Sequence, residues 1–279
     1  MRSPQRFIGM ATLALLLCVF RDGFCQAPPQ PAPASTRVTG EHRLFLRFVE
    51  DAAIVPSYWL EGRARLTTNE TAFDPNAEGA GESSVLAIGP VFAMNVAEDF
   101  EFGGSLFLAY RDPDDDGSDA GLTDLDMWGK VSVVSDPVKI SLGILASLPT
   151  GEEDKFLGTG ETNIEFFGGI RKDFSGLTLA GSAGLRINQD PEFEEVELEG
   201  KSSFMLGGAV LFPVGQKLVF SVEGALETER YEGLKNDSRL FGGFDWRFSE
   251  HLKLRGGAGG GLSDGAPGFE AQGAMVWLF

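Results

Sequence analysis

The chain has 279 residues, with 23 Lys and Arg against 41 Asp and Glu, which gives a formal charge of −18. So acidic a chain lacks the basic footprint that nucleic acid requires, and it disfavours docking on anionic lipid headgroups. Two cysteines and two histidines are too few for a zinc site or a disulfide framework. A hydrophobic content of 43% argues against a disordered chain.

The N-terminus has the features of a secretory signal. Arg2 and Arg6 form a positively charged start, and residues 7–20 form an uncharged, mostly apolar run. Such a run is too short for a membrane-spanning helix but typical of a signal peptide. Small residues at suitable spacing predict that residues 1–25 are removed after Cys25, with cleavage after Ala27 as the alternative.

Two short segments follow the signal. Residues 26–40 include a proline-rich run, which predicts an extended periplasmic linker that cannot join a sheet. Residues 41–56 contain Phe45 and Phe48 close to two arginines. This composition fits either a periplasmic leader or a small plug in the mouth of the domain that follows.

The remainder of the chain alternates between apolar and polar residues with a period of two. In residues 217–230, for example, Phe220 and Val222 occupy one face, and Glu223 and Glu227 occupy the other. Such segments predict twelve strands, at residues 57–68, 84–96, 99–111, 122–135, 138–148, 161–174, 177–188, 201–212, 217–230, 237–248, 252–262 and 269–279. Most are longer than a globular strand of ~5–6 residues and long enough to cross a membrane, which takes ~9–11 residues.

The connections between these strands alternate in length. Those after even-numbered strands are short, such as residues 97–98, 136–137 and 175–176, and several of those after odd-numbered strands are long and acidic, such as residues 112–121, 149–160 and 189–200. Tight turns at one end and longer loops at the other are typical of an outer-membrane barrel, with both termini on the periplasmic side. Residues 57–279 therefore predict an all-β, antiparallel up-and-down transmembrane β-barrel of about 12 strands. A soluble secreted β-sandwich is the alternative.

The last predicted strand supports this location. It carries apolar residues on one face and ends at Phe279. We expect the assembly machinery of the outer membrane to recognise this strand, and we expect lipid to surround the barrel. Aromatic residues near the predicted periplasmic ends fit an interfacial girdle: Tyr58, Phe100, Phe174, Phe212, Phe248 and Phe279.

Several short motifs resemble segments of a known family. They are residues 122–130 (Leu-Thr-Asp-Leu-Asp-Met-Trp-Gly-Lys), residues 148–152 (Leu-Pro-Thr-Gly-Glu), residues 158–162 (Gly-Thr-Gly-Glu-Thr) and residues 262–267 (Leu-Ser-Asp-Gly-Ala-Pro). The chain is similar, from about residue 47 to residue 279, to the outer-membrane transporters grouped as "MetA-pathway of phenol degradation" proteins. The resemblance implies a β-barrel that passes small hydrophobic or aromatic compounds.

The alternation also predicts which charged residues face the lumen. A charge that faced lipid near the midplane would cost ~2–4 kcal/mol, so the charged face is placed inside. Two interpretations are open: the charges pair across strands and close the interior, or they line a path for a polar solute. The candidate lumen-lining residues are Glu61, Arg63, Arg65, Asp124, Asp126, Lys130, Glu165, Arg171, Arg186, Glu223, Glu227, Arg239, Arg247 and Arg255.

The favoured function is passive passage of small molecules, and a non-conducting structural or anchoring barrel is the alternative. An enzyme ranks third, because neither His42 nor His251 has the serine context of an outer-membrane phospholipase. No cofactor is expected. Asp112, Asp114 and Asp116 match the start of a calcium loop, but its twelfth position is not Glu, so a solvated acidic loop is favoured.

Overall fold

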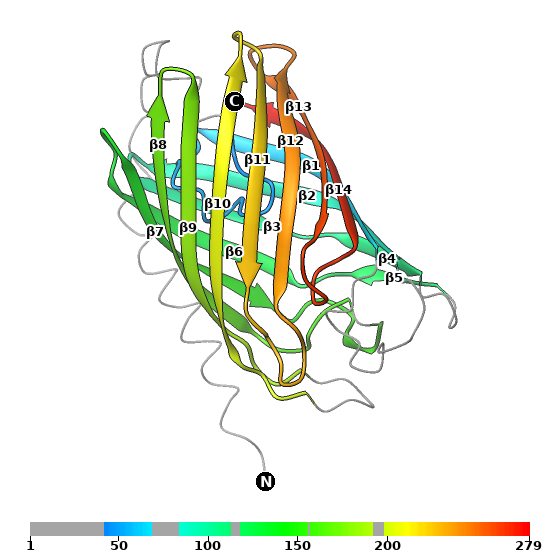
Figure 1. Ribbon diagram of the computed structural model, residues 1–279. Helices are drawn as coiled ribbons and strands as arrows, with labels where there is room; N and C mark the ends of the chain where they lie inside the picture. Colours follow the sequence, from blue (N-terminus) through cyan, green and yellow to red (C-terminus); the bar gives the residue numbers. More distant parts are fainter. Residues whose placement is uncertain (1–41, 69–83, 113–117, 156, 192–197) are drawn as a thin grey trace.

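The computed structural model describes residues 42–68, 84–112, 118–155, 157–191 and 198–279, and these form an antiparallel β-barrel (Figure 1). The predicted signal and linker, residues 1–40, lie outside the described residues. The strands are β1 (Tyr58–Thr68), β2 (Ser84–Ala97), β3 (Phe100–Ser105), β4 (Leu108–Asp112), β5 (Asp119–Leu122), β6 (Leu125–Val134), β7 (Lys139–Leu148), β8 (Asn163–Phe174), β9 (Leu177–Ile187), β10 (Ser202–Val214), β11 (Leu218–Glu227), β12 (Asp237–Arg247), β13 (Leu252–Gly261) and β14 (Phe269–Leu278). One 3-10 helix, η1 (Glu153–Lys155), lies in the loop after β7.

The sheet closes on itself through the first and last strands. β1 pairs with β14 from Trp59 opposite Leu278 to Thr68 opposite Phe269, and its other edge pairs with β2 along its whole length. Because β3 and β4 are two parts of one strand, and β5 and β6 are two parts of the next, the barrel has twelve strands. The predicted fold class is therefore confirmed. No helix in the described part of the chain is long and apolar enough to span a membrane.

The period of two decides which side chains lie inside. In β8, Glu165 and Arg171 are each 1% exposed, whereas Phe166 and Ile170 are each 50% exposed on the outer surface. The outer surface is accordingly covered with large apolar side chains from all parts of the barrel, among them Ile88, Leu108, Leu142, Leu179, Phe204, Phe220, Val222 and Leu240. Charged side chains therefore gather inside, as their alternation predicts.

A β-bulge interrupts the alternation in the fourth strand. Ser105 of β3 pairs with Asp126 of β6, whereas Leu108 of β4 pairs with Leu122 of β5. The fourth strand therefore holds one extra residue at Thr123 and Asp124, and beyond the bulge the faces exchange. As a result Leu122 is exposed on the outside and Gly121 is buried inside. The alternation in residues 122–135 predicts one continuous strand, so this change of face differs from the prediction.

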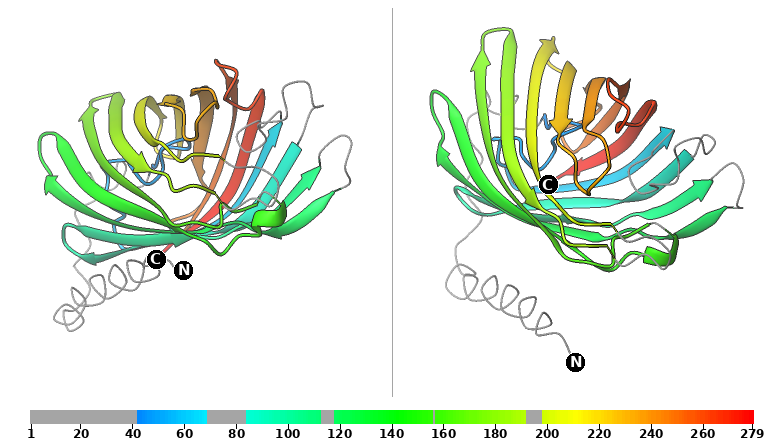
Figure 2. Two further views of the ribbon diagram at one scale, coloured as in Figure 1. Left: turned by 90° about the horizontal axis from the view of Figure 1, so that it is seen from below. Right: turned by 60° about the horizontal axis from the view of Figure 1, so that its bottom comes forward.

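The N-terminal segment (residues 42–56) lies inside the barrel. The strands surround it in the half nearer the short turns, which is the upper end of the barrel in Figure 1, and the view of Figure 2 places it within the ring of strands. Phe48 and Val55 of this segment pack in one cluster with Trp59, Trp128 and other inward-facing side chains. The interior of this half is thus a packed core built partly from a segment that belongs to no strand.

Candidate channel interior

A buried carboxylate anchors the N-terminal segment to the wall. Glu101 of β3 accepts two hydrogen bonds from the Arg43 guanidinium, at 2.8 and 3.0 Å, and one from the backbone amide of Val55 at 2.9 Å. The indole of Trp128 donates to the same carboxylate at 3.1 Å, and the Lys130 ammonium lies 3.3 Å away. Glu101, Arg43 and Lys130 are all fully enclosed, so this carboxylate compensates two buried cations at once.

Wall cations also satisfy the backbone carbonyls of the segment. The Lys130 Nζ donates to the carbonyls of Val49, Asp51 and Ala53 at 3.2, 2.7 and 3.0 Å. Arg171 of β8 donates to the carbonyl of His42 at 2.8 Å and forms an ion pair with Asp51 at 2.9 Å. The segment has turns but no regular secondary structure, so these side chains supply the partners that a buried irregular backbone needs.

Acceptors on the wall complete the docking. The Glu223 carboxylate of β11 accepts hydrogen bonds from the backbone amides of Phe45 and Leu46, at 2.8 and 2.9 Å. Arg255 of β13 donates to the carbonyl of Leu44 at 3.3 Å and pairs with Asp245 and Glu61 at 2.7 and 3.2 Å. Predicted lumen residues from distant strands therefore converge on one short stretch of backbone.

Each of the two histidines has a ring nitrogen close to an oxygen acceptor. His42 Nδ1 lies 3.0 Å from Asp245 Oδ2, and burial lowers the pKa of His42 against the opposing effect of that carboxylate. His251 Nδ1 lies 3.1 Å from the carbonyl oxygen of Leu278, near the short-turn end. Each histidine therefore makes a contact that fits a structural role.

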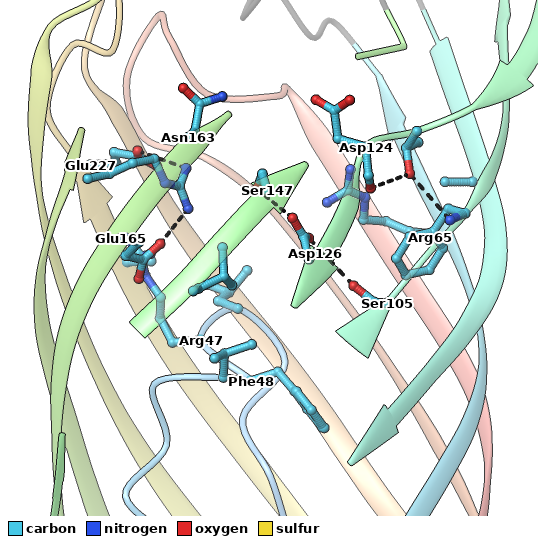
Figure 3. Close-up of a pocket in the computed structure, with 18 of the residues that line it drawn as sticks. Arg47, Phe48, Arg65, Ser105, Asp124, Asp126, Ser147, Asn163, Glu165 and Glu227 are labelled. Carbon is cyan, nitrogen blue, oxygen red and sulfur yellow. Dashed lines mark hydrogen bonds and ion pairs between the residues drawn. The ribbon is translucent and has the colours of Figure 1, made fainter. Parts of the chain in front are cut away.

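Toward the long loops the interior opens into a cavity of about 410 Å³, called here the lumen cavity. Its floor is formed by residues 45–50 of the N-terminal segment, and strands from around the barrel form its walls. Figure 3 shows Arg47 and Phe48 on the floor, Glu165 and Glu227 on one side, and Arg65 and Asp126 on the other. Most of the charged groups that line it are side chains predicted to face the lumen.

Most cations of the lumen cavity are held in ion pairs. Arg186 of β9 bridges Glu165 at 2.7 Å and Glu227 at 3.1 Å, and Arg230 also pairs with Glu227, at 2.7 Å. Arg239 of β12 pairs with Asp237 and with Glu270, the latter at 3.0 Å. The interpretation in which interior charges pair across strands therefore describes much of this wall.

Arg65 of β1 differs from these cations. It lines the lumen cavity and has no ion-pair partner among the described residues, whereas its neighbour on the same face, Arg63, pairs with Glu61 at 2.6 Å. A charge of this kind is available to water or to a solute in the cavity.

Two acidic residues of β6 and its bulge are held by hydrogen bonds rather than by cations. Asp126 accepts from Ser147 at 2.5 Å and from Ser105 at 3.5 Å. Asp124 accepts from the amide of Gly151 at 3.0 Å and from the amide and hydroxyl of Thr159 at 3.0 and 3.2 Å. Although the two residues lie on the same face, Asp126 binds neighbouring strands and Asp124 binds a loop.

The structure divides the predicted lumen residues into two groups. One contacts or surrounds the N-terminal segment and comprises Glu61, Lys130, Arg171, Glu223 and Arg255. The other lines the lumen cavity and comprises Arg63, Arg65, Asp124, Asp126, Glu165, Arg186, Glu227 and Arg239. Arg247 ends β12 near the short turns and is partly exposed. In the acidic loop, Asp112 ends β4, and Asp114 and Asp116 lie outside the described residues.

Large apolar side chains also lie inside the barrel, and they are absent from the predicted lumen residues. Trp59 and Trp128 are 1% and 2% exposed, and Phe167 and Phe241 are also buried inside. The signal was present, because Trp128 lies between Asp126 and Lys130 in the same alternating series, and Trp59 lies two residues before Glu61. The interior is therefore a mixed aromatic and ionic surface.

No protein-family model matches the chain, and no curated protein matches it in sequence. Among solved structures, the COG4313 outer membrane channel from Pseudomonas putida F1 superposes with a TM-score of 0.62 at 12% identity, covering 80% of this chain and 95% of that one. The KdgM porin gives a TM-score of 0.51 at 9% identity, covering 79% and 99%. The chain thus has the β-barrel fold of these outer-membrane proteins.

Proposed function

We propose that the protein is an outer-membrane channel for the passive passage of small solutes. The observation that carries this proposal is the lumen cavity, which leaves about 410 Å³ of space beside charged side chains inside a closed barrel. Small-molecule sites typically occupy ~300–1,000 Å³, so the cavity has room for a small solute. The channel fold of the similar structures supports the same assignment.

In this proposal the N-terminal segment is a plug rather than a periplasmic leader. Its backbone is bonded to Glu101, Lys130 and Glu223 of the wall, and it forms the floor of the lumen cavity. We assign the short-turn end to the periplasm and the long loops to the exterior, as in other outer-membrane barrels. The cavity then faces the exterior, and the plug restricts passage on the periplasmic side.

The class of solute follows from the lining. Phe48, Phe107 and Leu157 supply apolar surface, while Arg65 supplies charge. This mixture suits small compounds that carry both an apolar body and a polar group. Hydrophobic or aromatic compounds, which the family resemblance implies, fit this lining if they also carry a polar group. We propose no catalytic activity and no cofactor. The assembly machinery that recognises the C-terminal strand, and the surrounding lipid, are the proposed partners.

A non-conducting structural barrel is the second candidate, favoured by the packing of the N-terminal segment into half of the lumen. Planar-bilayer recordings of refolded protein distinguish the two. We expect discrete, reproducible openings from the intact mature chain and a larger unitary conductance after deletion of residues 42–56. Deletion of residues 28–34, in the predicted linker, is the matched control and should leave the conductance unchanged. Silent membranes from all three proteins would favour the structural barrel.

A further inference from the structure

The described residues of the loop between β7 and β8 (149–155 and 157–162, the β7–β8 loop) fold against the inner wall of the barrel. Leu157 of this loop is only 8% exposed and packs in one cluster with Ala87 of β2 and Ala109 of β4, with Phe107 against them. Leu157 and Thr159 both line the lumen cavity. The loop is therefore part of the cavity wall on the long-loop side, opposite the floor formed by the N-terminal segment.

One carboxylate holds both arms of this loop. Asp124 Oδ1 accepts from the amide of Gly151 in the first arm, and Oδ2 accepts from the amide and hydroxyl of Thr159 in the second arm. Flanking backbone contacts support the same docking: the amide of Leu125 donates to Thr150 Oγ1 at 2.9 Å. Asp124 belongs to the β-bulge of the fourth strand, next to the part of the inner wall against which the loop folds.

The two arms approach each other more closely than side chains allow. A Cβ atom added to Gly151 would lie 2.7 Å from Gly158 Cα, and one added to Gly158 would lie 2.6 Å from Asp124 Oδ1. Only glycine fits at these two positions without displacing the loop. Three of the motifs that carry the family resemblance, residues 122–130, 148–152 and 158–162, meet at this point.

We propose that Asp124 is a positioning residue that holds the β7–β8 loop inside the barrel, so that Leu157 and Thr159 limit the size of solutes entering the lumen cavity. This inference deepens the proposed function and rests on it for the assumption that small solutes pass through the barrel. The docking itself can be tested without conduction. Asp124 acts through the loop, in contrast to Asp126, which lines the same cavity and whose hydrogen bonds among the described residues come from Ser105 and Ser147 on neighbouring strands.

The experiment uses a cysteine reporter in the refolded mature chain, which contains no cysteine after residue 25. Ala225 of β11 lines the lumen cavity, so Ala225→Cys places a thiol there. Two reagents are compared, a small methanethiosulfonate and a maleimide that carries a polyethylene glycol chain. In the otherwise unchanged chain we expect the small reagent to react readily and the large one slowly.

The variants Asp124→Ala and Asp126→Ala each remove one lumen carboxylate from the same face. Loss of a hydrogen bond to a charged group changes an equilibrium constant about tenfold. Asp124→Ala should therefore increase the rate at which the large reagent reacts with the Ala225→Cys thiol by about tenfold or more. Asp126→Ala should leave that rate unchanged. Asp124→Asn should fall between, because its amide can accept from Gly151 but places a donor toward Thr159. Heat-modifiable gel mobility confirms that each variant retains a closed barrel.

A second reporter, Leu157→Cys, tests the docking directly. This thiol should react slowly in the otherwise unchanged chain and about tenfold faster when Asp124→Ala is added. Equal reactivity in the Asp124→Ala and Asp126→Ala backgrounds would overturn the inference, and so would a large reagent that reaches Ala225→Cys as fast as the small one. A silent bilayer with the expected labelling would count against the channel alone, and conduction with unchanged labelling would count against the role of Asp124 alone.

Discussion

The charged residues of this barrel differ in how far they are shielded from water. Glu101 accepts from a guanidinium, a backbone amide and an indole, and lies beside an ammonium, all within a fully enclosed site. By contrast, Glu152 and Lys155 form an ion pair in the β7–β8 loop whose side chains are 42% and 32% exposed. The desolvation of a charge is costly only where water cannot return, so the loss of a partner matters far more at the first site.

Glu101→Gln tests this difference at the scale of one residue. The substitution leaves Arg43 and Lys130 buried with less than their former compensation, and breaking a buried pair typically costs ~3–5 kcal/mol. We expect a loss of this order in the free energy of unfolding, measured by urea denaturation of the refolded protein in detergent. The matched control, Glu152→Gln, should cost at most ~1 kcal/mol, as exposed pairs do. Equal midpoints for the two variants would contradict the assigned role of Glu101.

At the scale of elements, the N-terminal segment depends on close approach to the wall. A Cβ atom on Gly243 of β12 would lie 2.4 Å from the ring of Phe45, whereas one on Gly208 of β10 would meet no atom within 4 Å. The wall therefore has a glycine at the position that the Phe45 ring approaches most closely. A substitution at Gly243 can disturb the packing of the N-terminal segment without any change in the segment itself.

Gly243→Val should loosen the N-terminal segment while the barrel stays closed. Overpacking of this kind typically costs ~1–3 kcal/mol, so the amides of Phe45 and Leu46, which donate to Glu223, should exchange with deuterium roughly tenfold faster or more. Gly208→Val is the control and should leave their exchange unchanged. If exchange in Gly243→Val matches that of the unsubstituted chain, the contact with Phe45 does not hold the segment.

The sequence predicts most of the strands, but it does not predict how the β7–β8 loop and the N-terminal segment bind inside the barrel. Most strands follow from alternation, because a side chain in a membrane barrel faces either lipid or lumen. The exception is β5 (Asp119–Leu122), which begins within residues 112–121, predicted as a loop. The docking of the β7–β8 loop does not follow, since Asp124 is indistinguishable by spacing from Asp126, and only the fold brings Gly151 and Thr159 to it. The two interpretations of residues 41–56 also stay open in the sequence, because the residues that bind them come from distant strands.

At the scale of the whole molecule, the apolar outer surface and the closure of the sheet both indicate a lipid environment. Large apolar side chains such as Ile88, Phe166 and Ile170 are at least half exposed around the barrel. Soluble monomers rarely expose contiguous apolar patches above a few hundred Å², so a surface of this kind requires lipid. Since β1 pairs with both β2 and β14, the first and last strands of the described sheet leave no open seam toward the lipid.

This arrangement predicts where the protein is found and how it unfolds. The expressed chain should fractionate with the outer membrane, and it should migrate differently on gels before and after heating, because a closed sheet resists detergent until all its strands separate together. Deletion of residues 269–279 removes β14, which leaves one edge of β1 and one edge of β13 without a partner; this variant should show no heat-dependent shift. The Glu152→Gln chain, altered only at a partly exposed ion pair, should behave like the unsubstituted protein. Recovery of the intact chain in the soluble fraction after osmotic shock would refute the membrane assignment, because the apolar belt would then be exposed to water.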